Sequence, residues 1–283
     1  MATTMHPKPL EAGRRVFTRI LVGIDGSQRS LDAARQASLL QDIDGQLTLF
    51  AAWNIGPVMG ATGSYVPYYL DEDSQRAAAQ ASLAAARDHV APYAAATTKL
   101  SRGAPADQLL DEIERDEDTL VCVGSSGIGR LLGIVEGSVA TAIIRHAPCS
   151  VLVARPARNG FPRSIVVGVD GSVESAAAYA AARYVAERFD AELRAVVARG
   201  GKSPDERLAA TITGGDHDDD HEPPARALMR AAERADLVVV GSRGLHGLAR
   251  LGSVSERVAH DAECSTLVVR EPAWQCIAAE LDR

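Results

Sequence analysis

The sequence predicts two tandem doubly wound α/β domains, each with a five-stranded parallel sheet flanked by helices. Short apolar runs alternate with segments of helical periodicity, which is typical of a parallel sheet covered on both faces. This alternation occurs twice along the chain. "ILVGIDGSQRS" at 20–30 returns as "IVVGVDGSVES" at 165–175, and "VGSSGIGRLLGIVEGSVATAIIRHAPCSVLVAR" returns as "VGSRGLHGLARLGSVSERVAHDAECSTLVVR". We therefore expect domains at 1–156 and 163–274, separated by the Pro/Gly/Arg-rich joint "ARPARNGFPR".

Each expected element of the first domain follows from its local pattern. The apolar runs predict strands at 19–25, 46–53, immediately before Gly103, 119–123 and 150–154. The helical patterns predict helices over 28–41, 72–91, 104–116 and 139–146. The second domain repeats this plan in shortened form, and most of the loss follows its second strand at about 192–198.

Composition excludes several classes of protein. The chain of 283 residues is 46% hydrophobic and 24% charged, which is typical of a soluble protein with a substantial core. Its net charge of -7 does not favour a nucleic-acid partner, which would need a basic face. No apolar run approaches the ~20 residues of a membrane span, and the polar start lacks the apolar region of a signal peptide. We therefore expect a cytoplasmic protein with no membrane or nucleic-acid partner.

A glycine-rich segment follows the fourth expected strand of the first domain. Gly124 and Gly127 lie directly after that strand, and Gly137 with Ser138 precedes the next helix. Ligands of open parallel sheets bind at the carboxyl ends of the strands. Helix N-termini there present unpaired N–H groups to anions, and glycines let the main chain close around a phosphate. The pattern therefore indicates a phosphate-binding segment.

This spacing, G-x2-G-x9-G-[ST], resembles the ATP-binding signature of the universal stress proteins. The similarity also covers the strand-ending Asp of "VGIDGS" and the "RHAPCSVLV" segment, and it extends over nearly the whole chain. The resemblance implies an adenine nucleotide alpha hydrolase-like fold, with ATP and Mg²⁺ as ligands.

The resemblance also implies a role for individual positions. Ribose and phosphates would meet Gly23, Ile24 and Asp25, and Asp25 would also approach the magnesium ion. The main chain of Ala52 would contact adenine. The remaining contacts would come from the glycine-rich segment and the following helix, at Val123, Gly124, Gly127, Gly137, Ser138, Val139 and Ala140. Ala140 stands where Ser or Thr is common, which removes one hydroxyl contact.

The second domain carries an altered copy of this site. The corresponding nucleotide-binding positions are Asp170, Gly241, Gly244, Gly252 and Ser253. Only seven residues separate Gly244 from Gly252, two fewer than in the first copy. The shorter segment predicts weaker nucleotide binding there, without excluding it.

Simpler explanations compete with these assignments. Each glycine could serve only close packing, and Asp25 could cap the helix that follows it. In the acidic run at 216–222, His217 and His221 could hold a metal if the run were helical. Gly215 before the run and prolines after it disfavour a helix, so we expect a solvated acidic loop there.

We expect an ATP-binding regulator of stress response or growth arrest, which changes how a protein partner binds. No general base or catalytic lysine stands out, so hydrolysis would be slow at most. The alternatives are a slow ATPase or nucleotide hydrolase and a nucleotide-independent interaction protein. The apolar fifth strands predict self-association, through pairing of the two domains within the chain or through a homodimer.

Overall fold

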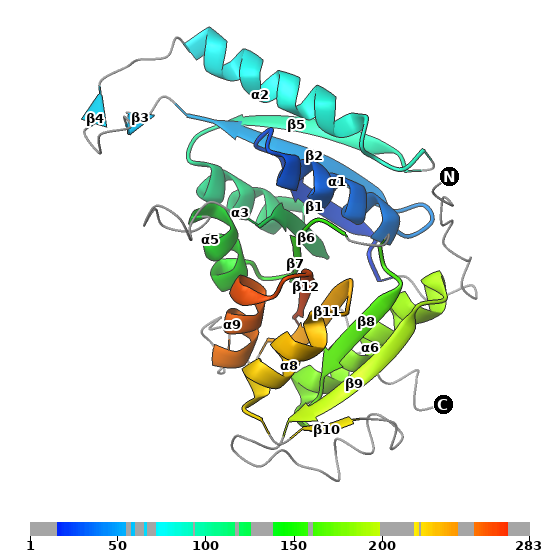
Figure 1. The fold of residues 1–283 in the computed structure, drawn as a ribbon. Helices are drawn as coiled ribbons and strands as arrows, with labels where there is room; N and C mark the ends of the chain where they lie inside the picture. The colour runs from blue at the N-terminus through cyan, green and yellow to red at the C-terminus, as the bar shows by residue number, and fades with distance from the viewer. Residues whose placement is uncertain are drawn as a thin grey trace.

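The computed structural model describes residues 16–54, 58–59, 65–66, 72–92, 94–116, 119–125, 138–157, 161–198, 218–220, 222–242 and 252–270. Its main feature is one ten-stranded sheet with the order β10-β9-β8-β11-β12-β7-β6-β1-β2-β5 (Figure 1). The first half contributes β1 (Arg19–Gly23), β2 (Gln46–Trp53), β5 (Ala96–Arg102), β6 (Leu120–Gly124) and β7 (Ser150–Ala154). The second half contributes β8 (Ser164–Gly168), β9 (Glu192–Ala198), β10 (Asp218–Asp220), β11 (Leu237–Gly241) and β12 (Ser265–Val269).

Helices cover both faces of this sheet. Those of the first half are α1 (Gln28–Leu40), α2 (Glu72–Arg87), α3 (Pro105–Asp116) and α5 (Ser138–His146). Those described in the second half are α6 (Val173–Phe189), α8 (Pro224–Ala232) and α9 (Ser253–Asp261). Side chains alternate along each strand, so Val22 joins the core under α1, α2 and α6, whereas Leu21 joins the core under α3, α5, α8 and α9. The predicted fold class is confirmed.

The two halves pair with each other through their fifth strands. Within each half the strands of the ten-stranded sheet are parallel, but β7 and β12 are antiparallel, with Leu152 opposite Leu267. These apolar strands therefore lie at the centre of the sheet and present no free edge to solvent. The pairing expected within the chain is present. The domain boundaries at 156 and 163 stay a prediction.

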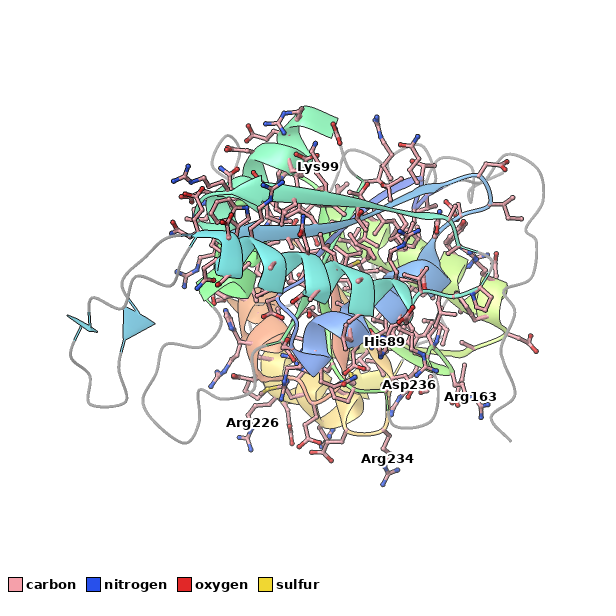
Figure 2. All side chains as sticks on the ribbon, turned by 90° about the horizontal axis from the view of Figure 1, so that it is seen from above. His89, Lys99, Arg163, Arg226, Arg234 and Asp236 are labelled. Carbon is pink, nitrogen blue, oxygen red and sulfur yellow. The ribbon has the colours of Figure 1, made fainter. Side chains whose placement is uncertain are left out.

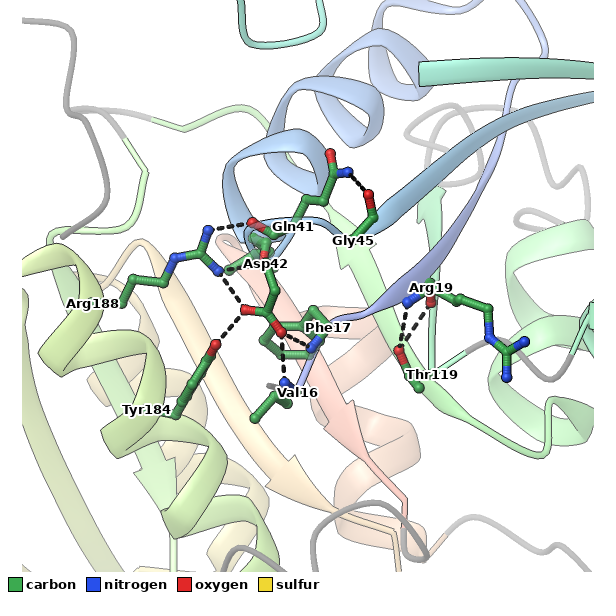
Figure 3. Close-up of polar contacts among 10 residues, drawn as sticks. Val16, Phe17, Arg19, Gln41, Asp42, Gly45, Thr119, Tyr184 and Arg188 are labelled. Carbon is green, nitrogen blue, oxygen red and sulfur yellow. Dashed lines mark hydrogen bonds and ion pairs between the residues drawn. The ribbon is translucent and has the colours of Figure 1, made fainter. Parts of the chain in front are cut away.

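A buried ion pair also joins the halves on the α1 and α6 side. The Asp42 carboxylate accepts hydrogen bonds from the backbone N–H groups of Val16 and Phe17, at 2.6 and 2.7 Å. It also accepts from Tyr184 and, at 2.9 Å, from the guanidinium of Arg188 (Figure 3). Because these donors surround the carboxylate, its charge is compensated inside the protein.

The expectation for the acidic run was wrong. Asp218–Asp220, expected within a solvated loop, form β10 and pair in parallel with residues 196–198 of β9. Backbone hydrogen bonding at a sheet edge does not require apolar side chains, so an acidic segment can supply the third strand of this half. Of the alternatives for Asp25, direct capping of α1 is not observed, because the N-cap is Ser27, whose side chain accepts from the N–H of Ser30.

The loop expected after β2 also contains a short hairpin, formed by β3 (Val58–Met59) and β4 (Tyr65–Val66). The Ala-rich helix α2 ends at Arg87, four residues earlier than expected. Within the described residues, no helix has the length and apolar character needed to cross a membrane.

Candidate functional site

A cavity lies at the point where strand order reverses in the first half. From β1 the chain proceeds to β2 and β5 on one side, and to β6 and β7 on the other. Such reversals leave a crevice at the carboxyl ends of the strands. The cavity there has a volume of about 90 Å³. Its described walls are formed by Gly23, Ile24, Asp25, Ser30, Phe50, Ala52, Pro105, Leu109, Val123, Gly124, Val139 and Ala140.

Ala52 directs main-chain hydrogen-bonding groups toward this cavity. The carbonyl of Phe50 accepts from the N–H of Ile24 at 2.8 Å, so Phe50 faces β1. The carbonyl of Trp53 accepts from Gly103 at 2.9 Å, so Trp53 faces the opposite neighbour, β5. Because backbone groups alternate along a strand, the N–H and C=O of Ala52 face the β1 side. Strand β1 has already ended at that level, which leaves both groups directed at the cavity.

Asp25 holds the turn between β1 and α1. Its Oδ1 accepts from the N–H of Ser27 at 2.9 Å and from the Ser27 hydroxyl at 2.6 Å. Gly26 between them has a φ of +81°, a left-handed conformation that favours glycine. The carboxylate therefore orients the N-cap of α1 while it stays exposed at the cavity mouth.

Gly124 is required for packing as well as for the cavity wall. A Cβ at this position would lie 2.6 Å from the carbonyl carbon of Arg29 and 2.8 Å from the N of Ser30. The first turn of α1 therefore packs directly on the end of β6. The Arg29 guanidinium also donates to the Ser125 hydroxyl at 2.7 Å, which ties the two segments together. The packing explanation for this glycine is correct, and it is compatible with a ligand role.

The opposite wall of the cavity comes from α3, which an ion pair holds against β5. Glu112 has a buried side chain, and its carboxylate accepts from Lys99 on β5 and from Arg115 at 2.6 Å. Figure 2 shows Lys99 on β5 at the side of α3. This pair fixes the helix that carries Pro105 and Leu109 into the cavity wall.

The structure brings together eight of the predicted positions of the first domain. These are Gly23, Ile24, Asp25, Ala52, Val123, Gly124, Val139 and Ala140. Ser138 begins α5. Gly127 and Gly137 lie outside the described residues.

Sequence reasoning missed four wall residues, which are Ser30, Phe50, Pro105 and Leu109. Phe50 could have been found, because it lies two residues before Ala52 and therefore shares its face of β2.

Asp25 is the only ionisable residue among the described walls of this cavity. In the described part of the chain, no group of three or more His, Cys, Asp or Glu side chains could hold a metal ion. The walls are otherwise apolar side chains, glycines and one serine, which suits a flat, largely uncharged ligand group.

The second half repeats the turn chemistry. Asp170 Oδ1 accepts from the N–H of Ser172 at 3.1 Å, and Ser172 caps α6. Gly241 packs on the backbone of Glu174, as Gly124 packs on Arg29. Gly252 is the N-cap of α9, and Ser253 is its first residue. Gly244 lies outside the described residues.

One difference between the halves concerns charge. The position of Arg29 beside the first site is Glu174 in the second half. Because a carboxylate repels phosphate, this exchange makes the second site less favourable for a polyanion.

Comparison with known proteins agrees with this architecture. The model of the universal stress protein family matches residues 17–155 and 205–270. The chain belongs to the universal stress protein family. The universal stress protein Rv2624c of Mycobacterium tuberculosis is 31% identical over 281 residues, covering 91% of this chain and 98% of the relative.

Two solved structures of universal stress proteins are also similar. The protein from Archaeoglobus fulgidus has a TM-score of 0.65 and 21% identity, covering 89% of this chain and 96% of that one. A universal stress protein in complex with cAMP covers 50% of this chain and 98% of its own length, with 25% identity and a TM-score of 0.33.

Proposed function

We propose that the first half of this universal stress protein binds an adenine nucleotide, ATP with Mg²⁺, and acts as a nucleotide-dependent regulator in stress response or growth arrest. The observation that carries the proposal is the cavity at the strand-order reversal, into which the main chain of Ala52 directs a donor and an acceptor. An adenine edge offers a matching acceptor and donor. Phe50 and Leu109 provide apolar walls for the faces of the base.

The remaining walls fit the sugar and phosphates. The exposed carboxylate of Asp25 is an acceptor for ribose hydroxyls at the cavity mouth. The N-terminus of α5, with Val139 and Ala140 at the cavity, presents backbone N–H groups and the positive end of the helix dipole. Magnesium would neutralise phosphate charge, with Asp25 as the one carboxylate among the described cavity walls. A cavity of about 90 Å³ encloses only part of such a ligand, so its phosphates would extend beyond these walls.

The described walls favour binding over turnover. Asp25 is their only ionisable side chain, and its Oδ1 already accepts two hydrogen bonds from Ser27. Phosphoryl transfer needs a positioned nucleophile and cations that stabilise the transition state, so hydrolysis would be slow. A slow ATPase would release phosphate over many turnovers and lose this activity on Asp25→Ala.

Calorimetric titration with ATP, ADP, AMP and cAMP, each with Mg²⁺, tests the proposal. We expect saturable binding in the wild-type protein. Ala140→Leu fills the cavity and should abolish it, whereas Ala142→Leu on the same helix, outside the cavity wall, should retain it. Wild-type protein that binds none of the four, or Ala140→Leu protein that binds like wild type, would refute the site. A nucleotide-independent interaction protein predicts the first of these results.

A further inference from the structure

Helix α5 connects the proposed nucleotide site to the other half of the protein. Its amino-terminal end carries Val139 and Ala140 in the cavity wall, and its last residue is His146. At nine residues it is too short to be stable by itself in water. Its position, and therefore the direction of its N–H groups at the cavity, must be set by tertiary contacts.

One of these contacts comes from Arg270, directly after β12 of the second half. Its guanidinium Nη2 donates to the carbonyl of Ile144 in the last turn of α5. Its backbone N–H donates to the Ser150 hydroxyl at 3.2 Å. The last carbonyls of a helix lack intrahelical donors and carry the negative end of the dipole, so a cation there stabilises the helix.

Arg270 is buried for this contact, with only 7% of its surface exposed. Burial lowers the pKa of the guanidinium, and the neighbouring Cys149 thiol opposes this shift. Its Nε makes no hydrogen bond within the described structure. An arginine is costly to bury, so its compensation by the end of α5 makes that contact structurally important.

A second contact joins α5 to α9 across the same seam. Arg145 donates through Nε and Nη2 to Oε1 of Glu256, at 2.8 and 2.6 Å. Both side chains are partly exposed, so this pair is screened by salt. The second half therefore contacts α5 both at its last carbonyls and on its side.

The first half makes the mirrored contact. Arg155, directly after β7, donates through Nη2 to the carbonyls of Ala259 and His260 at the end of α9, at 2.7 and 2.9 Å. Each half thus supplies an arginine to the helix of the other, because β7 and β12 run antiparallel. Arg155 is an internal control, because it is as buried as Arg270 but contacts α9, which contributes no residue to the described walls of the first cavity.

We propose that Arg270 is a positioning residue for the nucleotide site of the first half, so that the second half sets the affinity of that site. The inference rests on the proposed function. Removal of the guanidinium loosens the carboxyl end of α5, which the Arg145–Glu256 pair and the buried Ile144 still hold. The helix N-terminus then holds its N–H groups less closely in register with the phosphates. The tandem arrangement is thereby required for full affinity at one site.

The test compares full-length Arg270→Met with Arg155→Met, each titrated calorimetrically with MgATP and each monitored by thermal unfolding. We expect Arg270→Met to weaken binding on the order of tenfold, and Arg155→Met by less than about twofold. Arg155→Met should nevertheless lose at least as much melting temperature, because the Arg155 guanidinium donates to Cys264, Thr266, Ala259 and His260, whereas that of Arg270 donates to Ile144. Glu256→Gln should weaken binding about two- to threefold at low salt, and this difference from wild type should vanish at high salt.

The outcomes separate this inference from the proposed function. If wild-type protein binds no nucleotide, the proposed function fails and the inference falls with it. If wild-type protein binds but Arg270→Met and Arg155→Met have equal affinities, the inference alone is overturned. Should Arg270→Met not fold, Arg270→Gln is titrated instead, because glutamine is polar but removes the positive charge from the end of α5. Unchanged affinity in that folded variant would also overturn it.

Discussion

Gly124→Ala should destabilise the protein by displacing the first turn of α1. The added Cβ would lie 2.6 Å from the carbonyl carbon of Arg29, 2.8 Å from its oxygen and 2.8 Å from the N of Ser30. Ordinary contacts begin at 3.4 Å, so the backbone of α1 must move by roughly 0.6–0.8 Å. This movement would strain the 2.7 Å hydrogen bond between Arg29 and Ser125. We expect the free energy of unfolding to fall by about 2–3 kcal/mol, near the upper end of the range for overpacked cores.

Gly23→Ala is the matched control, because its Cβ would meet a side-chain end, the Cδ2 of Leu109 at 3.3 Å. That methyl group can shift, so the expected loss is below about 1 kcal/mol. In thermal unfolding followed by circular dichroism, Gly124→Ala should melt roughly 4–9 °C below wild type and Gly23→Ala within about 3 °C. Gly124→Ala protein that melts within about 1 °C of wild type would refute the packing argument.

Three further predictions concern the Asp42 ion pair and the N-caps of α1 and α6. Burial and the hydrogen bond to Asp42 raise the pKa of Tyr184 in the folded state. The protonated tyrosine therefore contributes its full share to the free energy of unfolding below about pH 10, and this share falls by about 1.4 kcal/mol per pH unit above it. Tyr184→Phe should remove that slope from urea unfolding between about pH 10 and 12, and an unchanged slope would contradict the assignment. Arg188→Met removes the cation that pairs with Asp42 and should lower the free energy of unfolding by about 3–5 kcal/mol, measured by urea unfolding at pH 7. A decrease below about 1 kcal/mol would be inconsistent with a buried ion pair. Ser27→Ala and Ser172→Ala each remove an N-cap and should each cost about 1 kcal/mol in the same assay; no loss in either would argue against capping.

The fold class was predictable because the strands are buried on both faces. Residues 120–123 of β6 are all buried, and such strands appear in the sequence as continuous apolar runs. The internal repeat then predicted the second half. Strand β10 was not predictable, because Asp disfavours strands in general and Asp218–Asp220 are recruited only by pairing with β9.

The site was predictable where it follows a strand end. Asp25 and Gly124 come directly after apolar runs whose carboxyl ends meet at one edge of the sheet. Pro105 and Leu109 were missed because their contribution depends on how α3 packs on β5, through the pair of Lys99 and Glu112. The contacts of Asp42 with Arg188, which is 146 positions away, likewise carry no local sequence signal.

A crystal structure of the full chain with MgATP tests the central claim most directly. The account predicts an adenine ring between Phe50 and Leu109, within hydrogen-bond distance of the N–H and C=O of Ala52, with phosphates toward the N-terminus of α5. A nucleotide bound elsewhere, or a cavity that stays empty at millimolar MgATP, would contradict it.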